Sequence, residues 1–218
     1  MIVVPSVNTP NGHHALIGRT ANMLADIYQN HVNMVVWERQ PNTSLTMECQ
    51  ALLTKKGFTG HLTTLPINKL RHLADALPDL ASSPQLKADI QLLVEMFSCL
   101  FGLQTIGLRL TPLTGSMCPR FHVDRVPCRL ITTYIGTGTE WLPHDSVDRS
   151  KLGTGSNGLN DAQSGLYSSP QAIQTLHPGD VALLKGEAWE GNEGAGLVHR
   201  SPTIGPGQRR LLLTLDFI

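Results

Sequence analysis

The chain has 218 residues, of which 41% are hydrophobic and 16% are charged. This composition is typical of a globular protein with one substantial domain, or with a core domain and a helical appendage. Basic and acidic residues balance at 17 each, so the composition argues against nucleic acid as a partner. No apolar run approaches the roughly 18 residues that cross a bilayer, and residues 1–5 lack the basic region of a signal peptide. We therefore expect a cytoplasmic protein with no membrane partner.

The first 102 residues are expected to be mainly helical. Apolar residues recur at helical spacing in the segments 11–29, 66–77 and 84–101. Pro84 at the start of segment 84–101 and Gly102 just past its end are typical of the two ends of a helix. The sequence therefore predicts a helical N-terminal region, residues 1–102, that packs on the rest of the chain.

From residue 103 onwards the chain becomes a series of short segments rich in valine, isoleucine, leucine and threonine. Turns rich in glycine and proline, such as Pro178-Gly179-Asp180, separate them. The segments cover residues 103–113, 120–124, 128–135, 180–184, 197–199 and 209–217. Many short strands at this spacing favour a sandwich, a barrel or a jelly roll. The expected fold class is α+β, with a jelly-roll core over residues 103–218.

One long interruption, residues 143–170, is rich in glycine, serine, asparagine and aspartate, with hardly an apolar residue. A connection of this length is usually a lid, a binding loop or a disordered segment. We expect one of these three here.

The four cysteines form no Cys-x-x-Cys pair. In a cytosolic protein they are expected to be reduced and mostly buried. Cys118 is a special case, because it precedes His122 by four residues and would share its face of a strand. A thiolate at that place would favour zinc, although Pro119 disturbs strand geometry.

Three residues form a candidate metal site. Alternate residues of a strand point to the same face, so His122 and Asp124 would converge while Val123 packs on the opposite side. His199 ends a later apolar segment, and the 75 residues between Asp124 and His199 allow several strands to bring it to the same cavity. Two imidazoles and one carboxylate on one side of a metal leave other coordination positions open, which is typical of non-haem Fe(II) oxygenases.

At this point the sequence resembles a known superfamily. His122-x-Asp124, then Pro178-Gly179-Asp180, then His199 and an arginine about ten residues later are similar to the Fe(II)/2-oxoglutarate-dependent dioxygenases, whose core is a double-stranded β-helix. The resemblance covers residues 103–218. The amino-acid sequences of segments 118–125 and 138–143 also resemble those of an uncharacterised bacterial domain family.

The resemblance implies that His122, Asp124 and His199 bind iron and that a following arginine binds the distal carboxylate of 2-oxoglutarate. Arg209 and Arg210 are both candidates, and they face opposite ways on a strand. The sequence motif Gly207-Gln-Arg209 favours Arg209 as the carboxylate-binding residue. The motif Arg210-x-x-x-Thr214 favours Arg210. Supporting positions near the cofactor are expected at Tyr134 and Thr132, and contacts with substrate are expected at Glu140 and Trp141.

Two functions remain open at this stage. The first is an Fe(II)/2-oxoglutarate-dependent oxygenase that hydroxylates or demethylates an unknown small molecule or peptide. The second is a cupin-like metal-binding protein without oxygenase activity, for instance one that handles zinc. The carboxylate-binding arginine discriminates between them, because a protein that only binds metal does not need it. The sequence leaves the oligomeric state open.

Overall fold

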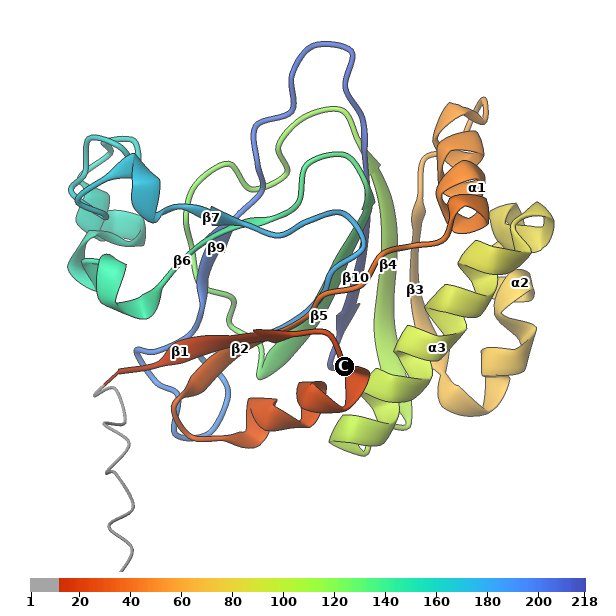
Figure 1. The fold of residues 1–218 in the computed structure, drawn as a ribbon, viewed down its shortest axis with the longest axis horizontal. Coiled ribbons are helices and arrows are strands. Elements are labelled where there is room, and N and C mark those ends of the chain that lie inside the picture. Colours follow the sequence, from red (N-terminus) through yellow and green to blue (C-terminus); the bar gives the residue numbers. More distant parts are fainter. Residues whose placement is uncertain (1–11) are drawn as a thin grey trace, which may run out of the picture.

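The computed structural model describes residues 12–218, so the expectation for residues 1–5 lies outside the described part (Figure 1). The strands are β1 (His14–Gly18), β2 (Val32–Trp37), β3 (His61–Pro66), β4 (Thr105–Leu113), β5 (Cys128–Ile135), β6 (Glu140–Leu142), β7 (Gln174–Thr175), β8 (Val181–Lys185), β9 (Val198–Arg200) and β10 (Arg210–Asp216). The α-helices are α1 (Thr43–Thr54), α2 (Leu73–Ala76) and α3 (Pro84–Phe101). Short 3-10 helices are η1 (Ala21–Tyr28), η2 (Ile67–His72), η3 (Pro78–Ser82), η4 (His144–Ser146), η5 (Arg149–Lys151), η6 (Gly153–Ser156) and η7 (Pro170–Ala172).

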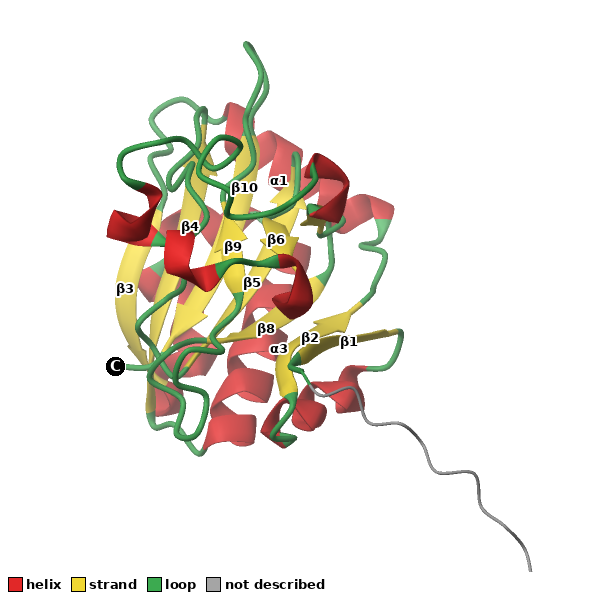
Figure 2. Cartoon of the chain, turned by 90° about the vertical axis from the view of Figure 1, so that its left-hand side faces the viewer, coloured by secondary structure: helices red, strands yellow, loops and turns green. Residues whose placement is uncertain are grey.

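The strands form two sheets. The large sheet has the order β1-β2-β8-β5-β10-β4-β3, and the small sheet has the order β7-β6-β9. In the large sheet β1 and β2 run parallel, while the other neighbouring pairs are antiparallel. Figure 1 shows α1, α2 and α3 on one side of the large sheet, and Figure 2 shows β6 and β9 in front of its opposite face. The molecule is a mixed helix-and-sheet protein built around one large sheet.

Two of the helices begin or end as their residues dictate. The side chain of Asn42 accepts a hydrogen bond from the backbone N–H of Leu45 at 2.8 Å and so caps the start of α1. Pro84 occupies the first turn of α3, and Gly102 follows its end with a φ of 66°, in the left-handed region that glycine adopts without strain. The predicted helix at 84–101 is confirmed.

The two faces of the large sheet bury different sets of side chains. One face packs against the helices, where Leu130, Leu183 and Leu213 meet residues of α1 and α3 in the main hydrophobic core. The opposite face packs against the small sheet through a second cluster, which contains Met34, Val36, Ile131, Ala182, Leu184, Trp141, Leu176 and Leu197. The large sheet is therefore covered on both faces, and polar residues between the sheets need partners of their own.

The expectation that residues 1–102 are mainly helical is wrong for three segments. Within the described residues, β1, β2 and β3 belong to the large sheet. The segment expected to form one helix over 11–29 contains β1 and the 3-10 helix η1 instead. The apolar spacing of so short a segment suits either structure, and the parallel pairing of β1 with β2 decides in favour of a strand.

The long connection 143–170 is neither structureless nor poor in packing. It contains η4, η5 and η6. Leu152 and Leu166 from this segment pack with Phe121, Leu142 and Val198 in a third hydrophobic cluster. The connection is therefore a packed segment rather than a structureless loop, and its role as a lid or a binding loop stays a prediction.

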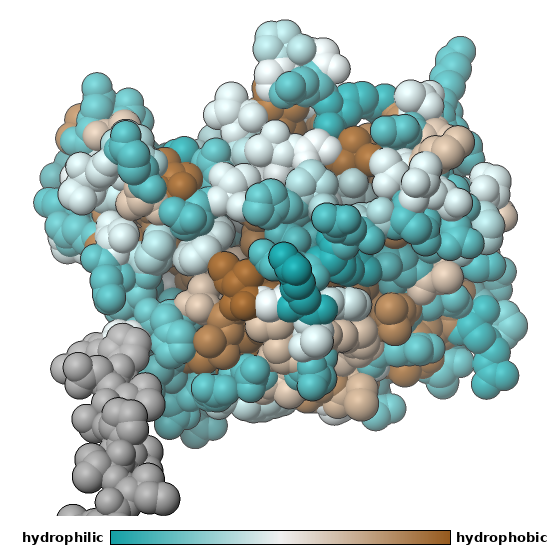
Figure 3. All heavy atoms as spheres, viewed as in Figure 1, coloured by the Kyte–Doolittle hydropathy of each residue, from teal (hydrophilic) through white to brown (hydrophobic). Residues whose placement is uncertain are grey.

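The outer surface carries both polar and apolar side chains. Figure 3 shows a face that is mostly hydrophilic, with apolar side chains gathered in its lower half. Among the described residues, none of the helices combines the length and the apolar character needed to span a membrane.

Candidate metal centre and its pocket

The structure brings His122, Asp124 and His199 together between the two sheets. One possible ligand atom from each residue lies within 4.8 Å of the others. His199 is on β9, whereas His122 lies in an extended segment that pairs with His199 through a single antiparallel bridge. The expected strand at 120–124 is therefore reduced to this bridge, but it suffices to place both histidines side by side. Metal binding by the three residues stays a prediction.

Backbone carbonyls fix how the two imidazoles are oriented. Nδ1 of His122 lies 2.9 Å from the carbonyl oxygen of Arg120, and Nδ1 of His199 lies 3.1 Å from that of Leu197. If each Nδ1–H donates to its carbonyl, each neutral ring keeps a lone pair on Nε2. Both Nε2 atoms face Asp124, and in that tautomer each offers its lone pair to a metal.

The distances around Asp124 leave room for an ion. Nε2 of His122 is 3.6 Å from Oδ1 of Asp124, and Nε2 of His199 is 3.4 Å from Oδ2. These separations are too long for good hydrogen bonds. They are close to the ~3 Å that separates neighbouring ligand atoms, each about 2.1 Å from one ion.

Asp124 is held as a carboxylate. Burial opposes its ionisation, but His122, His199 and Arg129 outweigh that effect and hold the pKa of Asp124 well below its usual range. In turn, the carboxylate raises the pKa of His122. Arg129 on β5 donates from Nη1 to Oδ2 of Asp124 at 2.7 Å and from Nε to Asp216 at 2.6 Å. Arg129 thus fixes the orientation of the carboxylate, a role that no sequence motif indicates.

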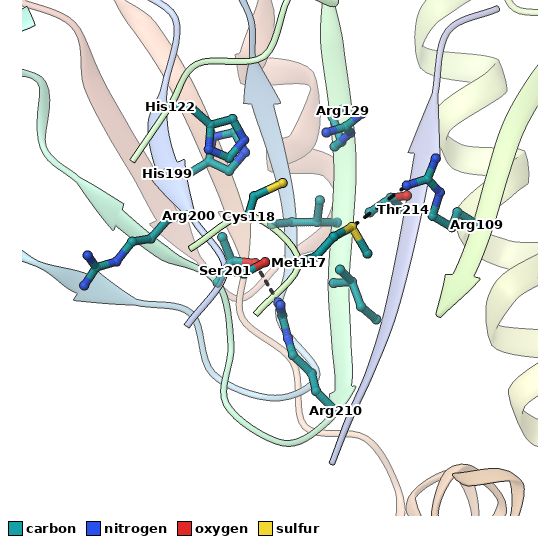
Figure 4. A pocket seen from close by; sticks show the side chains of 13 residues that line it. Arg109, Met117, Cys118, His122, Arg129, His199, Arg200, Ser201, Arg210 and Thr214 are labelled. Carbon is teal, nitrogen blue, oxygen red and sulfur yellow. Dashed lines mark hydrogen bonds between the residues drawn. The ribbon is translucent and has the colours of Figure 1, made fainter. Parts of the chain in front are cut away.

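A pocket opens beside the histidines and is lined by residues of both sheets. Figure 4 shows His122 and His199 side by side on one wall, with Arg210 and Arg109 on other sides of the same pocket. Arg210 is 1% exposed. Its guanidinium donates to Oγ1 of Thr133 at 2.9 Å and to Oγ1 of Thr139 at 2.7 Å, while Nη1 has no hydrogen-bond partner among the described residues.

Strand alternation separates the two candidate arginines. Arg210 shares the pocket face of β10 with Leu212 and Thr214, as expected from their spacing. Arg209 is exposed, and its guanidinium donates to the backbone carbonyl of Leu53. Of the two, only Arg210 lines the pocket beside the histidines.

The expected supporting residues on β5 are displaced by one position. The hydroxyl of Tyr134 donates to Asp89 on α3 at 2.7 Å, on the helical side of the sheet. Thr132 is buried but does not line the pocket. Thr133, the residue between them, contacts Arg210. Alternation along β5 explains this, because Thr133 shares its face with Ile131 of the pocket, whereas Thr132 and Tyr134 share the face of Leu130 on the helical side.

The two residues expected to contact substrate lie outside the pocket and have partners within the protein. Oε2 of Glu140 accepts a hydrogen bond from Nε of Arg200 at 2.6 Å. Trp141 is buried in the cluster between the sheets, opposite His199 in the pairing of β6 with β9. Neither residue lines the pocket.

Arg200 connects three segments around the site. Besides Glu140 on β6, it donates to Asp161 of the long connection at 3.1 Å and lies over the ring of Phe121, next to His122. Asp161 also accepts from the backbone N–H of Phe121 at 2.9 Å. This network holds the segments that carry both histidines. No sequence pattern indicates this network, because Asp161 lies 40 positions from Phe121 in the chain.

Comparison with protein families assigns the chain to one family. A family model described as "Protein of unknown function (DUF1826)" matches residues 18–216. The chain therefore belongs to this family, which confirms the prediction of an uncharacterised domain family. No curated protein matches the chain.

Several solved structures are similar to the chain at low identity. A dioxygenase for auxin oxidation from rice has 11% identity and a TM-score of 0.49, with 94% of this chain and 83% of that chain covered. HygX from Streptomyces hygroscopicus, solved with iron bound, has 9% identity and a TM-score of 0.48, with 90% and 86% covered. An oxidoreductase of the 2OG-Fe(II) oxygenase family from Burkholderia pseudomallei has 11% identity and a TM-score of 0.39, with 93% of each chain covered.

Proposed function

We propose that this DUF1826 protein is a non-haem Fe(II)/2-oxoglutarate-dependent oxygenase that hydroxylates or demethylates a small molecule or peptide. In this proposal the two sheets form a double-stranded β-helix core, and His122, Asp124 and His199 bind the iron. The observation that carries the proposal is Arg210, a buried guanidinium without a carboxylate partner in the described chain, on the same pocket as both histidines.

The donor set of the site fits Fe(II). Two imidazole nitrogens and one carboxylate on one side of an ion leave the remaining octahedral positions open, as in non-haem Fe(II) oxygenases. The Nδ1 contacts of both histidines and the Arg129 contact to Asp124 are the kind of outer interactions that orient metal ligands. Cys118 lines the pocket but does not belong to the cluster of three, so the thiolate that would favour zinc lies apart from it.

The surroundings of Arg210 fit the distal carboxylate of 2-oxoglutarate. Burial lowers the pKa of Arg210 to about 10, and the guanidinium remains charged at neutral pH. A buried charge without a counter-ion costs free energy, which a bound carboxylate would offset. The planar guanidinium suits a carboxylate because it offers two parallel donors. A protein that only binds metal has no need of such a residue.

The chain's own residues would bind and orient the reactants. Fe(II) and 2-oxoglutarate, when bound, supply O2 activation, with oxidation of 2-oxoglutarate to succinate and CO2 and of a substrate C–H bond. Arg210 fixes one end of 2-oxoglutarate, and Thr133 and Thr139 hold the guanidinium in place. Ile131 and Leu212 give the pocket apolar surface that excludes water.

The test is the anaerobic addition of Fe(II) and then 2-oxoglutarate to the purified apo-protein. We expect a visible metal-to-ligand charge-transfer band, together with succinate formation once air is admitted. Asp124→Ala should abolish the band because it removes one of three ligands. Asp75→Ala should keep it, because the Asp75 side chain is 84% exposed on α2.

The same experiment can also contradict the proposed oxygenase function. Tight zinc binding by the wild-type protein, with no charge-transfer band and no succinate in air, would contradict the oxygenase function. That result would favour the cupin-like metal-binding alternative.

A further inference from the structure

The wall of the pocket carries an excess of positive charge. Its 13 lining residues include four arginines, Arg109, Arg129, Arg200 and Arg210, and two histidines, but no aspartate or glutamate. A concave site lined by one sign of charge attracts ligands of the opposite sign. Which arginines contribute to that attraction depends on their partners.

Two of these arginines are neutralised by the protein. Arg129 pairs with Asp124 and Asp216. Arg200 pairs with Glu140 and Asp161. Each faces two carboxylates, so neither offers a free charge to a ligand. In the proposed function Arg210 binds the cosubstrate, and one molecule of 2-oxoglutarate has one distal carboxylate.

Arg109 is the remaining arginine. It is exposed on β4, and its recorded polar side-chain contact is a weak one, from Nη1 to Sδ of Met117 at 3.9 Å. Within residues 12–218 it forms no ion pair. In the sheet it lies opposite Thr214 of β10, whose other neighbour is Ile131 of β5. These three side chains form one row across the pocket face of the sheet.

Apolar side chains flank this charge on the same face of the sheet and in the pocket wall. Leu62 lies opposite Arg109 in the pairing of β3 with β4 and is 73% exposed. Met117 is 41% exposed. The row from Ile131 to Leu62 therefore offers one free cation between apolar surfaces, which suits an organic anion better than an inorganic one.

We propose that Arg109 binds an oxyanion of the primary substrate, a carboxylate or a phosphate, whose apolar part lies against Leu62 and Met117. Arg109 is then the residue that selects anionic substrates, while Arg210 binds the cosubstrate. The assignment of Arg210 to the cosubstrate rests on the proposed oxygenase function. The free charge of Arg109 and its place on the pocket do not.

The test measures binding rather than turnover. The 15N-labelled protein is loaded with zinc and saturating 2-oxoglutarate, which occupies Arg210, and its backbone amide signals are followed by NMR. The probes are butyrate, monobutyl phosphate and the neutral butyramide. The two anions distinguish a carboxylate from a phosphate ester, and butyramide has the same apolar part as butyrate without the charge.

We expect at least one anion to shift the amide signals of Arg109 and Thr214 saturably, with butyramide binding much more weakly. Arg109→Gln should weaken the binding of that anion at least about tenfold, since a charge-assisted hydrogen bond is lost. Arg71→Gln, at an exposed arginine of η2 away from the pocket, should leave it unchanged.

Three results would overturn the inference: no saturable shift from either anion, equal binding of butyramide, or unchanged binding in Arg109→Gln. Failure of the oxygenase function has a different signature. In that case 2-oxoglutarate itself leaves the amide signals of Arg210 and Thr133 unchanged, while the comparison of wild type with Arg109→Gln still decides the role of Arg109.

Discussion

Arg209 and Arg210 are adjacent and chemically identical, yet the strand gives them opposite surroundings. Arg209 is exposed and bonds to the backbone of Leu53, whereas Arg210 is buried between the sheets. The difference arises because successive side chains of a strand point to opposite faces. The pair therefore offers a matched experiment on the role of one guanidinium.

Arg210→Gln should weaken 2-oxoglutarate binding and leave metal binding intact. Loss of one partner of a buried, hydrogen-bonded charge pair costs about 2 kcal/mol or more, which is roughly a 30-fold rise in the dissociation constant. Anaerobic titration of the charge-transfer band measures it. Arg209→Gln is the control and should change this constant less than about twofold. Equal effects of the two substitutions would disprove the assignment to Arg210.

The four cysteines should differ sharply in reactivity. Cys49 and Cys128 are buried, and burial raises the pKa of both thiols, that of Cys49 to about 12. Cys99 and Cys118 are exposed. Because the thiolate is the reactive form, a disulfide reagent should modify two thiols of the native protein quickly and the other two only after unfolding.

Cys118 adds a test of the pocket. It lines the pocket with His122 and His199, so Fe(II) with 2-oxoglutarate should slow its modification, while Cys99 on the far side serves as an internal control. Four equally fast thiols, measured by mass spectrometry of labelled peptides, would contradict the buried placement of Cys49 and Cys128.

At the scale of elements, the site depends on how β9 is joined to its surroundings. Arg200 follows His199 on this strand and bonds to Glu140 of β6 and to Asp161 of the long connection. Asp161 is buried and also accepts the backbone N–H of Phe121. The connection 143–170 therefore contributes to the position of both histidines, although none of its residues lines the pocket.

Asp161→Ala should destabilise the protein because it leaves the Phe121 N–H and part of Arg200 without a partner. The expected loss is about 3 kcal/mol in the free energy of unfolding, measured by urea denaturation. The exposed control Asp75→Ala should cost less than ~0.5 kcal/mol. A change in Asp161→Ala as small as in the control would show that the network contributes little to stability.

The sequence predicts elements best where local chemistry and tertiary packing agree. α3 has Pro84 and Gly102 at its ends, and β5 occupies the predicted residues 128–135. β1, β2 and β3 were missed, because these segments become strands only through their pairing in the large sheet, in which β2 joins β8 and β3 joins β4. Such pairing cannot be read from a local hydrophobic pattern.

In the site too, local spacing predicts some residues, whereas others depend on tertiary contacts. The convergence of His122 with Asp124 follows from two-residue spacing, and the position of His199 followed from the order of the segments. Thr132 and Tyr134 were expected at the pocket, but Thr133, on the same face of β5 as Ile131, is the residue that contacts Arg210. The partners Arg129 and Asp161 depend on long-range contacts, which composition and spacing do not reveal.

At the scale of the whole molecule, the large sheet has the main hydrophobic core on one face and the candidate site on the other. Its helical face holds the main hydrophobic core. Its other face, with the small sheet, encloses the histidines, Asp124 and Arg210. In the proposed function, this arrangement holds the metal ligands and the carboxylate-binding guanidinium on one rigid framework, which is what precise positioning of reactants requires.

The most direct test of this arrangement is a crystal structure of the protein grown anaerobically with Fe(II) and 2-oxoglutarate, with anomalous data at the iron edge. We predict one anomalous peak bonded to His122 Nε2, His199 Nε2 and the Asp124 carboxylate, with 2-oxoglutarate on the ion and its distal carboxylate on Arg210. An ion elsewhere, a site completed by Cys118, or 2-oxoglutarate without contact to Arg210 would contradict the proposed function.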